Sequence, residues 1–155
     1  MPVTRREMCL LLPAFVPAAV GLEALAAEDN SLPSAAYAFA QMPMHIQDNA
    51  QLRPILKGKL ATGEALEAHE TTLPPGGAPH PPHHHVHSEM FLMREGSIEL
   101  TVNGKSFLLQ PGALGFVHSN DEHGVKNVSS IAATYFVVAF GPGADTQPPV
   151  VTPSP

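Results

Sequence analysis

The sequence contains a single cysteine, Cys9, among 155 residues. One thiol cannot close a disulfide within the chain, so an oxidising compartment cannot staple this domain through thiols. Basic residues are also few, with 8 Lys and Arg against 14 Asp and Glu and a formal net charge of −6. No basic patch is present to release counterions from a phosphate backbone, and this excludes nucleic acids as expected partners.

Long apolar runs are missing as well. The best candidate, residues 8–22, is interrupted by prolines and falls short of the ~20 apolar residues that a membrane span requires. Arg5 and Arg6 precede it and small residues follow it, which predicts a secretory signal over residues 1–26. A membrane anchor is the alternative; cleavage after Ala26 would leave no stable anchor. The paired arginines resemble a twin-arginine signal, and the general secretory route stays open. We expect a periplasmic or secreted protein.

The remaining chain divides by composition. Residues 27–50 are rich in Ala, Pro, Ser and Asn and are predicted to form an N-terminal arm. Residues 51–141 are predicted to form one folded domain, because no internal repeat is present. Residues 142–155 contain five prolines, and we expect this tail to be disordered.

Short apolar segments separated by turn residues, with no helical period, predict an all-β domain. The Asn103–Gly104 pair predicts a type I′ hairpin turn. The predicted strands are Gln51–Leu60, Ala65–Leu73, His83–His85, Glu89–Arg94, Ser97–Val102, Lys105–Leu109, Ala113–Val117, Gly124–Asn127 and Ile131–Phe140. Many short strands at this spacing are typical of a sandwich or barrel.

Histidine is abundant in one place, because five of the nine histidines lie within residues 80–87. On a strand, His83 and His85 would point to the same face, and Glu89 can join them after a short bend. Such a cluster of nitrogen and oxygen ligands suits a first-row transition metal.

The same residues belong to a longer pattern. Gly77, His83, His85, Glu89 and Gly96 follow one another as G-x5-H-x-H-x3-E-x6-G. Every fixed position of the first motif of the cupin superfamily is present, and the sequence therefore resembles that superfamily over about residues 50–140. A lone H-x-H would be far less specific.

A second segment begins at Gly112, with 15 residues between it and Gly96, and resembles the second cupin motif, G-x5-P-x-G-x2-H-x3-N. Gly112, His123 and Asn127 match it, whereas His118 replaces the proline and Asn120 replaces the glycine. Asparagine accepts left-handed backbone conformations better than most residues, so it is a plausible substitute for that glycine.

The resemblance implies a single antiparallel jelly-roll β-barrel. It also implies that His83, His85, Glu89 and His123 bind one divalent transition metal ion; Mn, Fe, Ni, Cu, Co and Zn all remain open. Three imidazoles and one carboxylate would leave open positions in an octahedral site, where a substrate oxygen can bind. The ion could then polarise an enolate or activate oxygen, as in 2-His-1-carboxylate iron sites. A degenerate cupin without metal is the alternative.

The other histidines are assigned by their positions. His118 is the candidate catalytic group, because it can lean over the open coordination positions and exchange protons near neutral pH. A loop histidine that fills the place of the proline is the alternative. His84 is expected to point outward, while His80 and His87 are expected at the surface or beside the ligands. His45 and His69 carry no signal above background.

Alternation along the strand predicts what surrounds the metal. If Glu89 points inward, Phe91 and Met93 also do, and they give the cavity an apolar wall that suits an organic molecule. Met90 and Leu92 then face outward, which favours a second sheet or a homodimer partner. Filling of the barrel is the alternative to substrate contact for five residues: Phe91, Met93, Phe107, Phe116 and Tyr135.

Three functions remain open on the sequence. The leading hypothesis is an exported metal-dependent enzyme, an oxidoreductase of the dioxygenase type that acts on a small organic molecule. The nearest alternative is an isomerase or lyase that uses the ion as a Lewis acid. The third is a protein that binds a small ligand or a metal without turnover, because no obvious general base accompanies the four ligands.

Overall fold

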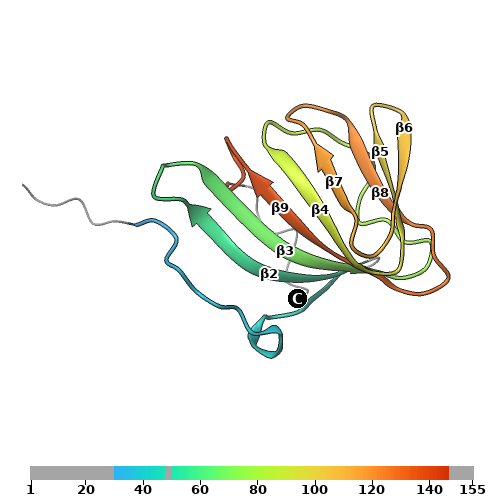
Figure 1. Cartoon of the computed structure of the whole chain (residues 1–155), viewed down its shortest axis with the longest axis horizontal. Coiled ribbons are helices and arrows are strands. Elements are labelled where there is room, and N and C mark those ends of the chain that lie inside the picture. Colours follow the sequence, from blue (N-terminus) through green and yellow to red (C-terminus); the bar gives the residue numbers. More distant parts are fainter. Residues whose placement is uncertain (1–29, 48–49, 147–155) are drawn as a thin grey trace, which may run out of the picture.

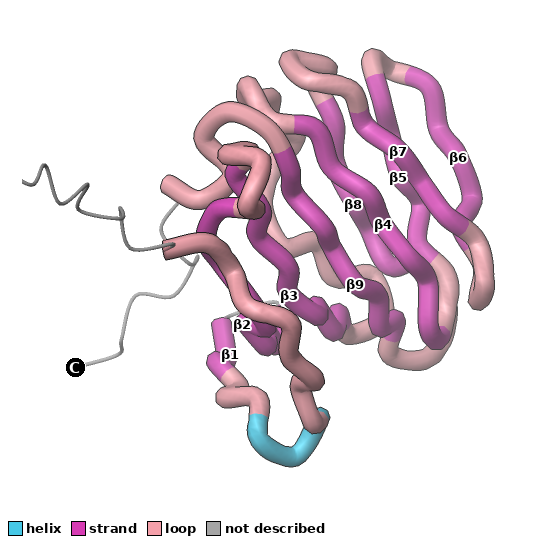
Figure 2. The backbone as a smooth tube through the Cα atoms, turned by 60° about the vertical axis from the view of Figure 1, so that its left-hand side comes forward, coloured by secondary structure: helices cyan, strands magenta, loops and turns pink. Residues whose placement is uncertain are grey.

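The computed structural model describes residues 30–47 and 50–146. In this part of the chain, strands dominate, and one short 3-10 helix, η1 (Phe39–Gln41), is present (Figure 2). The strands are β1 (His45–Gln47), β2 (Ala50–Lys59), β3 (Ala65–Leu73), β4 (Ser88–Glu95), β5 (Ile98–Val102), β6 (Lys105–Leu109), β7 (Leu114–Val117), β8 (His123–Asn127) and β9 (Ala133–Phe140). Across residues 30–47 and 50–146, no helix is long and apolar enough to cross a membrane.

The strands form two antiparallel sheets. The larger has the order β1-β2-β3-β9-β4-β7, and the smaller has the order β6-β5-β8. Figure 1 shows the larger sheet curving toward the smaller one, which lies beside β4 and β7. The predicted all-β, antiparallel jelly-roll architecture is confirmed.

Most predicted strands are present, with ends shifted by one or two residues, as expected for strand boundaries. The predicted strand His83–His85 is wrong. Only His83 makes a bridge, to His123, and the rest of this segment is loop. The preceding residues, Pro81 and Pro82, have no N–H to donate to a ladder. The structure also adds β1, which lies within the predicted N-terminal arm and pairs with β2.

Turn chemistry follows the sequence closely. Asn103 and Gly104 have φ values of 48° and 77°, the left-handed pair that a type I′ hairpin requires between β5 and β6. Asn120, which replaces glycine in the second motif, has a φ of 65°. Gly96 of the first motif has a φ of 71°, and a Cβ there would lie 2.7 Å from the Ala132 carbonyl oxygen. Backbone geometry therefore explains these motif positions.

Alternation on β4 also agrees with the prediction, because Phe91 and Met93 are buried while Leu92 is exposed. Tyr135 on β9 is buried beside them. Phe107 and Phe116 are 48% and 51% exposed and do not fill the barrel. Phe116 points to the outer face of the large sheet, between the buried Gly115 and Val117. Phe107 pairs with the buried Leu100 and so shares its inner face, but it lies on the edge strand β6, where it remains exposed. The buried cluster lies between the sheets and includes Leu73, Ile98, Leu100, Leu109, Val117 and Val125.

The arm packs on the outer face of the large sheet. The Phe39 ring contacts the guanidinium groups of Arg53 and Arg94, at 4.4 and 5.3 Å from the ring centre. Arg94 also donates a hydrogen bond of 2.6 Å to Glu70, whose side chain is buried. In the predicted tail, Ala144 is buried against the end of the barrel. The predicted signal and the tail beyond residue 146 lie outside the described residues.

Asn127 ends β8 and secures the loop that follows. Its fully buried amide donates hydrogen bonds to the carbonyls of Leu73 (3.0 Å) and Ile131 (2.8 Å). Its amide oxygen accepts two more from Ser129, both at 2.8 Å. This network accounts for asparagine at the last position of the second motif.

We expect Asn127→Ala to lower the free energy of unfolding by about 3 kcal/mol, because it removes these bonds and takes the amide donor away from the buried carbonyl of Leu73. Urea denaturation measures the change. Lys126→Ala, at an exposed position on the same strand, is the control and should change stability by less than about 0.5 kcal/mol. Equal stability of the two variants would show that the network does not hold the loop.

Candidate metal centre

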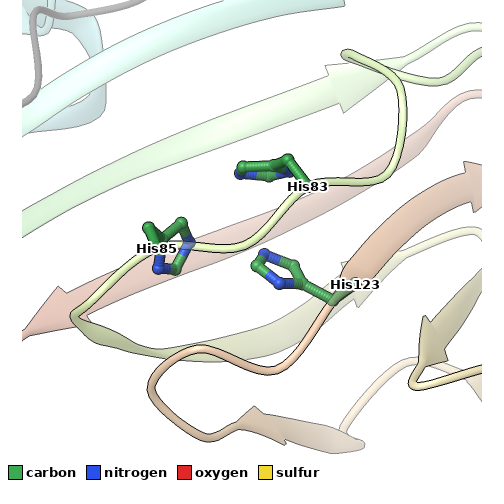
Figure 3. A group of neighbouring side chains, drawn as sticks. All are labelled: His83, His85 and His123. Atoms are coloured by element: carbon green, nitrogen blue, oxygen red, sulfur yellow. The ribbon is translucent and has the colours of Figure 1, made fainter.

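Three histidines meet where the loop before β4 passes the start of β8. His83 and His85 lie on this loop, and His123 is the first residue of β8. Two backbone hydrogen bonds of 2.8 and 2.9 Å join His83 to His123 and fix the loop against the strand. Figure 3 shows the three imidazole rings turned toward a common space, and each pair of ring centres lies within 5.2 Å.

Glu89 on β4 completes the group. One carboxylate oxygen lies 3.2 Å from His85 Nε2, and the other lies 3.3 Å from His123 Nε2. The four residues that the two motifs predict as ligands are therefore brought together, although they come from a loop and two strands of different sheets.

Backbone carbonyls set the orientation of two rings. Nδ1–H of His85 donates to the carbonyl of His87, and Nδ1–H of His123 donates to that of Asp121, both at 2.9 Å. The carbonyls can only accept, so each Nε2 is left with its lone pair directed away from the backbone. A metal site needs this tautomer.

Three ring nitrogens in this group are buried and make no hydrogen bond: His83 Nδ1, His85 Nε2 and His123 Nε2. Two of them lie near Glu89 at ion-pair distance but without hydrogen-bond geometry. Burying such atoms without a partner is costly. One ligand nitrogen from each of the three histidines lies within 4.8 Å of the others. Three imidazole nitrogens and a carboxylate fit a divalent transition metal, which would satisfy the orphaned atoms.

The surroundings of the four predicted ligands shift the pKa values of three of them. Burial raises the pKa of Glu89, but contacts with His123, His85 and His87 outweigh it and hold this pKa well below its usual value. Burial, together with the neighbouring His80, His123 and His85, lowers the pKa of His83 to about 4. Burial also lowers the pKa of His85, but Glu89 outweighs it and the net shift is upward. His83 and Glu89 are therefore in their metal-binding forms at neutral pH.

The group lines one end of a cavity of about 850 Å³, a volume within the usual range for small-molecule sites. Most of its surface is apolar. Phe91, predicted for the apolar wall, is among the lining residues, and Tyr135 lines the cavity as well. Met93, also predicted for this wall, is buried but is not among the lining residues. The apolar wall consists mainly of Leu52, Leu56, Phe91, Val125, Val137 and Ala139.

His87 belongs to this site, whereas its position in the sequence indicated only a bend at the surface or beside the ligands. It is 3% exposed, and its ring stacks on that of His85 at 3.6 Å. Its Nε2 lies 3.4 Å from a carboxylate oxygen of Glu89. His87 therefore packs against one predicted ligand and contacts another.

We expect His87→Ala to weaken metal binding by roughly 10- to 100-fold, because groups that orient ligands have effects of this size. The His87 backbone carbonyl, which accepts the hydrogen bond from His85, is retained in this variant. The loss of metal affinity therefore measures the effect of the His87 imidazole alone. Titration of the apo-protein with Zn²⁺ measures it, with Val86→Ala, at an exposed neighbouring position, as the control. Wild-type affinity in His87→Ala would refute this role.

The remaining predicted positions lie outside the ligand group. His84 is exposed, as expected. His80 packs edge-on against His83, with ring centres 4.2 Å apart. His118 is exposed, its Nδ1 bonds to the Ser119 carbonyl, and it does not line the cavity. This placement gives no support to direct proton exchange between His118 and a molecule bound at the ligand group.

The structure also brings two unassigned residues into the cavity. Glu67 and His69 on β3 both line it, and His69 Nδ1 lies 2.9 and 3.0 Å from the two carboxylate oxygens of Glu67. Their i, i+2 spacing on a strand is the only sequence signal that could have paired them.

Comparison with known proteins agrees with the fold and the motifs. Residues 69–139 match the family model of the cupin domain. The fold is a cupin fold. A cupin described as RmlC-like, from Shewanella frigidimarina, has a TM-score of 0.59 at 19% identity, covering 74% of this chain and 97% of its own. The family match and the structural neighbours together support the cupin superfamily. No curated protein matches the sequence.

Other cupins of similar structure have diverse descriptions. A predicted oxalate decarboxylase from Thermotoga maritima has a TM-score of 0.58 at 15% identity, covering 69% of this chain and 99% of its own. The polyketide cyclase RemF from Streptomyces resistomycificus has a TM-score of 0.57 at 18% identity, and the match covers 70% of this chain and 80% of RemF. The cupin fold therefore specifies no single reaction, and function must be argued from the site.

Proposed function

We propose that this protein is a mononuclear metal-dependent enzyme, of the oxygenase type, that acts on a small organic molecule. One observation carries the proposal: three buried imidazole nitrogens without hydrogen bonds lie close together, two of them beside Glu89, at one end of a mostly apolar cavity. Buried polar atoms without partners are rare in proteins, and a cation among them explains all three at once.

The residues of the chain have separate tasks in this proposal. His83, His85, His123 and Glu89 hold the ion. The apolar wall excludes water and accepts the hydrocarbon part of a substrate. A bound divalent ion would polarise a substrate oxygen or activate dioxygen, which makes oxygenase chemistry possible at this donor set.

Oxygen uptake tests the reaction class. The protein is loaded with Fe²⁺, Mn²⁺, Ni²⁺ or Cu²⁺ in turn and supplied with phenolic or diketone compounds in an oxygen electrode. We expect metal-dependent uptake that His83→Ala abolishes. Uptake that persists unchanged in His83→Ala would refute the proposed role of the ligand group.

A second reaction class is favoured by Glu67 and His69. A histidine with a carboxylate partner inside the cavity suits proton transfer, which an isomerase or lyase needs when a metal serves only as a Lewis acid. Turnover that is equal under air and under nitrogen would favour this class over the oxygenase. Binding of a small molecule with no product under either gas would instead identify a non-enzymatic binding protein.

We also propose that the protein forms a homodimer through the outer face of the large sheet. Leu92, Leu114 and Phe116 are exposed there, and Phe116 stacks with Phe140 at 6.3 Å. A contiguous apolar face of this kind is typical of an interface. Phe116→Glu should convert a dimer to a monomer in light scattering, whereas Lys105→Glu, at an exposed position, should not. A monomeric wild-type protein would refute this proposal.

A further inference from the structure

The pair formed by Glu67 and His69 lies in the same cavity as the metal ligands but outside their cluster. Both side chains project from β3 toward the interior, with exposed fractions of 20% and 21%. The next inward residue, Thr71, also lines the cavity. The two polar groups therefore remain accessible to a bound molecule in surroundings that are otherwise mostly apolar.

The sheet register relates the pair to the metal ligand Glu89. Glu67 pairs with Ala139 on β9, and Ala139 pairs with Glu89 on β4. The two carboxylates thus occupy one row across three strands. The usual spacing between strands puts their Cα atoms about 10 Å from each other. The residue between them is an alanine, so no large side chain of that row separates them.

His69 lies in the next row, where it pairs with Val137, and Val137 pairs with Phe91. These two side chains form an apolar floor between the histidine and the metal end. A small molecule lying on this floor can place one end at the ligand group and the other at His69.

The hydrogen bond determines which ring nitrogen of His69 faces Glu67 with a proton. An ionised carboxylate only accepts, so Nδ1 of His69 carries the proton that Glu67 binds. In the neutral ring, Nε2 is then an acceptor. Across residues 30–47 and 50–146, no hydrogen bond to this Nε2 is present. This is the arrangement of a general base with an orienting carboxylate.

We propose that His69 is the general acid–base residue of the cavity and that Glu67 positions it. The proposal rests on the metal-dependent function above and names the substrate class: a carbonyl compound whose oxygen binds at the metal end and which carries a C–H beside that carbonyl. The C–H bond breaks, its electron pair remains on the substrate as an enolate, and the proton moves to His69 Nε2. Return of the proton to the same or a neighbouring carbon completes the step without an oxidant.

Hydrogen–deuterium exchange tests this step with pyruvate as the probe, since it offers metal-binding oxygens and a methyl group beside a ketone. Zinc-loaded protein is incubated with pyruvate in D₂O, and loss of the methyl proton signal is followed by NMR. His69→Gln and Glu67→Leu are compared with the wild type, and His118→Gln serves as the rival histidine. Bound zinc is measured in every sample.

We expect the wild-type protein to catalyse exchange, His69→Gln to lose at least about 100-fold with full zinc content, and His118→Gln to retain wild-type exchange. Exchange that is absent in the wild type, unchanged in His69→Gln, or lost in His118→Gln alone would overturn the proposal. Failure of the wild type to bind zinc would instead refute the metal-dependent function.

Glu67 is tested by a signal that loss of packing alone would not produce. Nitrogen-15 NMR of the His69 ring should show the Nδ1–H tautomer in the wild type and a mixture of tautomers in Glu67→Leu. Glu67→Gln keeps an accepting oxygen and should restore the wild-type tautomer. The same tautomer in wild type and Glu67→Leu would show that Glu67 does not position the ring.

Discussion

Replacement of His123 by alanine should weaken the binding of a divalent transition metal by more than about 100-fold. The loss should exceed that caused by removing a residue that only orients a ligand. The side chain is 2% exposed and its Nε2 lies 3.3 Å from Glu89. Its Nδ1–H donates a hydrogen bond to the Asp121 carbonyl. Removal takes away one of the four expected ligands and leaves a buried gap among the other three. Competition with a chromogenic chelator measures the affinity.

His84→Ala is the matched control, because it removes an imidazole from the same loop at an exposed position. Its affinity should equal that of the wild type. The backbone bridge between His83 and His123 does not involve either altered side chain, so both variants should keep the fold, which circular dichroism verifies. Equal losses in the two variants would show that the metal lies elsewhere in the histidine cluster.

Acidification should release the metal in a graded way. The pKa of His85 is raised above its ordinary value of 6.5. Protons therefore begin to compete with the metal for this imidazole at a pH above 6.5, and the competition grows as the pH falls. Each pH unit below it should lower the apparent affinity about tenfold, or roughly 100-fold over two units. The pKa of His83 is about 4, so its proton competes only near that pH, where the slope should steepen.

Chelator competition between pH 4 and pH 8, in buffers that do not bind metal, measures this profile. Glu89 should not contribute to the slope in this range, because its pKa is held well below its usual value. An affinity that is constant from pH 8 to pH 5 would contradict the assignment of His85 as a ligand.

The strands and turns were predictable because local chemistry determines them. The strands Ala65–Leu73 and Lys105–Leu109 match the prediction at both ends, since turn residues bound them. Asn103–Gly104 forms the predicted turn because few residue pairs accept two left-handed φ values. The segment at His83 was mispredicted because prolines limit its pairing, and a single bridge is enough to hold it in place.

The ligand group was predictable from motif spacing, but its surroundings were not. His87 and His69 become important only through residues distant in the sequence. His69 shares the cavity with Glu89 because β9 lies between β3 and β4, and the sequence does not reveal this strand order. The exposure of Phe107 and Phe116 depends in the same way on the strand order, which leaves Phe107 on an edge strand and Phe116 on the outer face of the large sheet.

The most direct test of the metal-centre account is elemental analysis of the protein purified from its native host without chelators. The account predicts about one divalent transition metal ion per chain, from the group Mn, Fe, Ni, Cu, Co and Zn. The same analysis of His123→Ala should find less than about a tenth of that amount, given the expected loss of affinity. A wild-type protein that contains none of these metals, and binds none when they are added, would contradict the account.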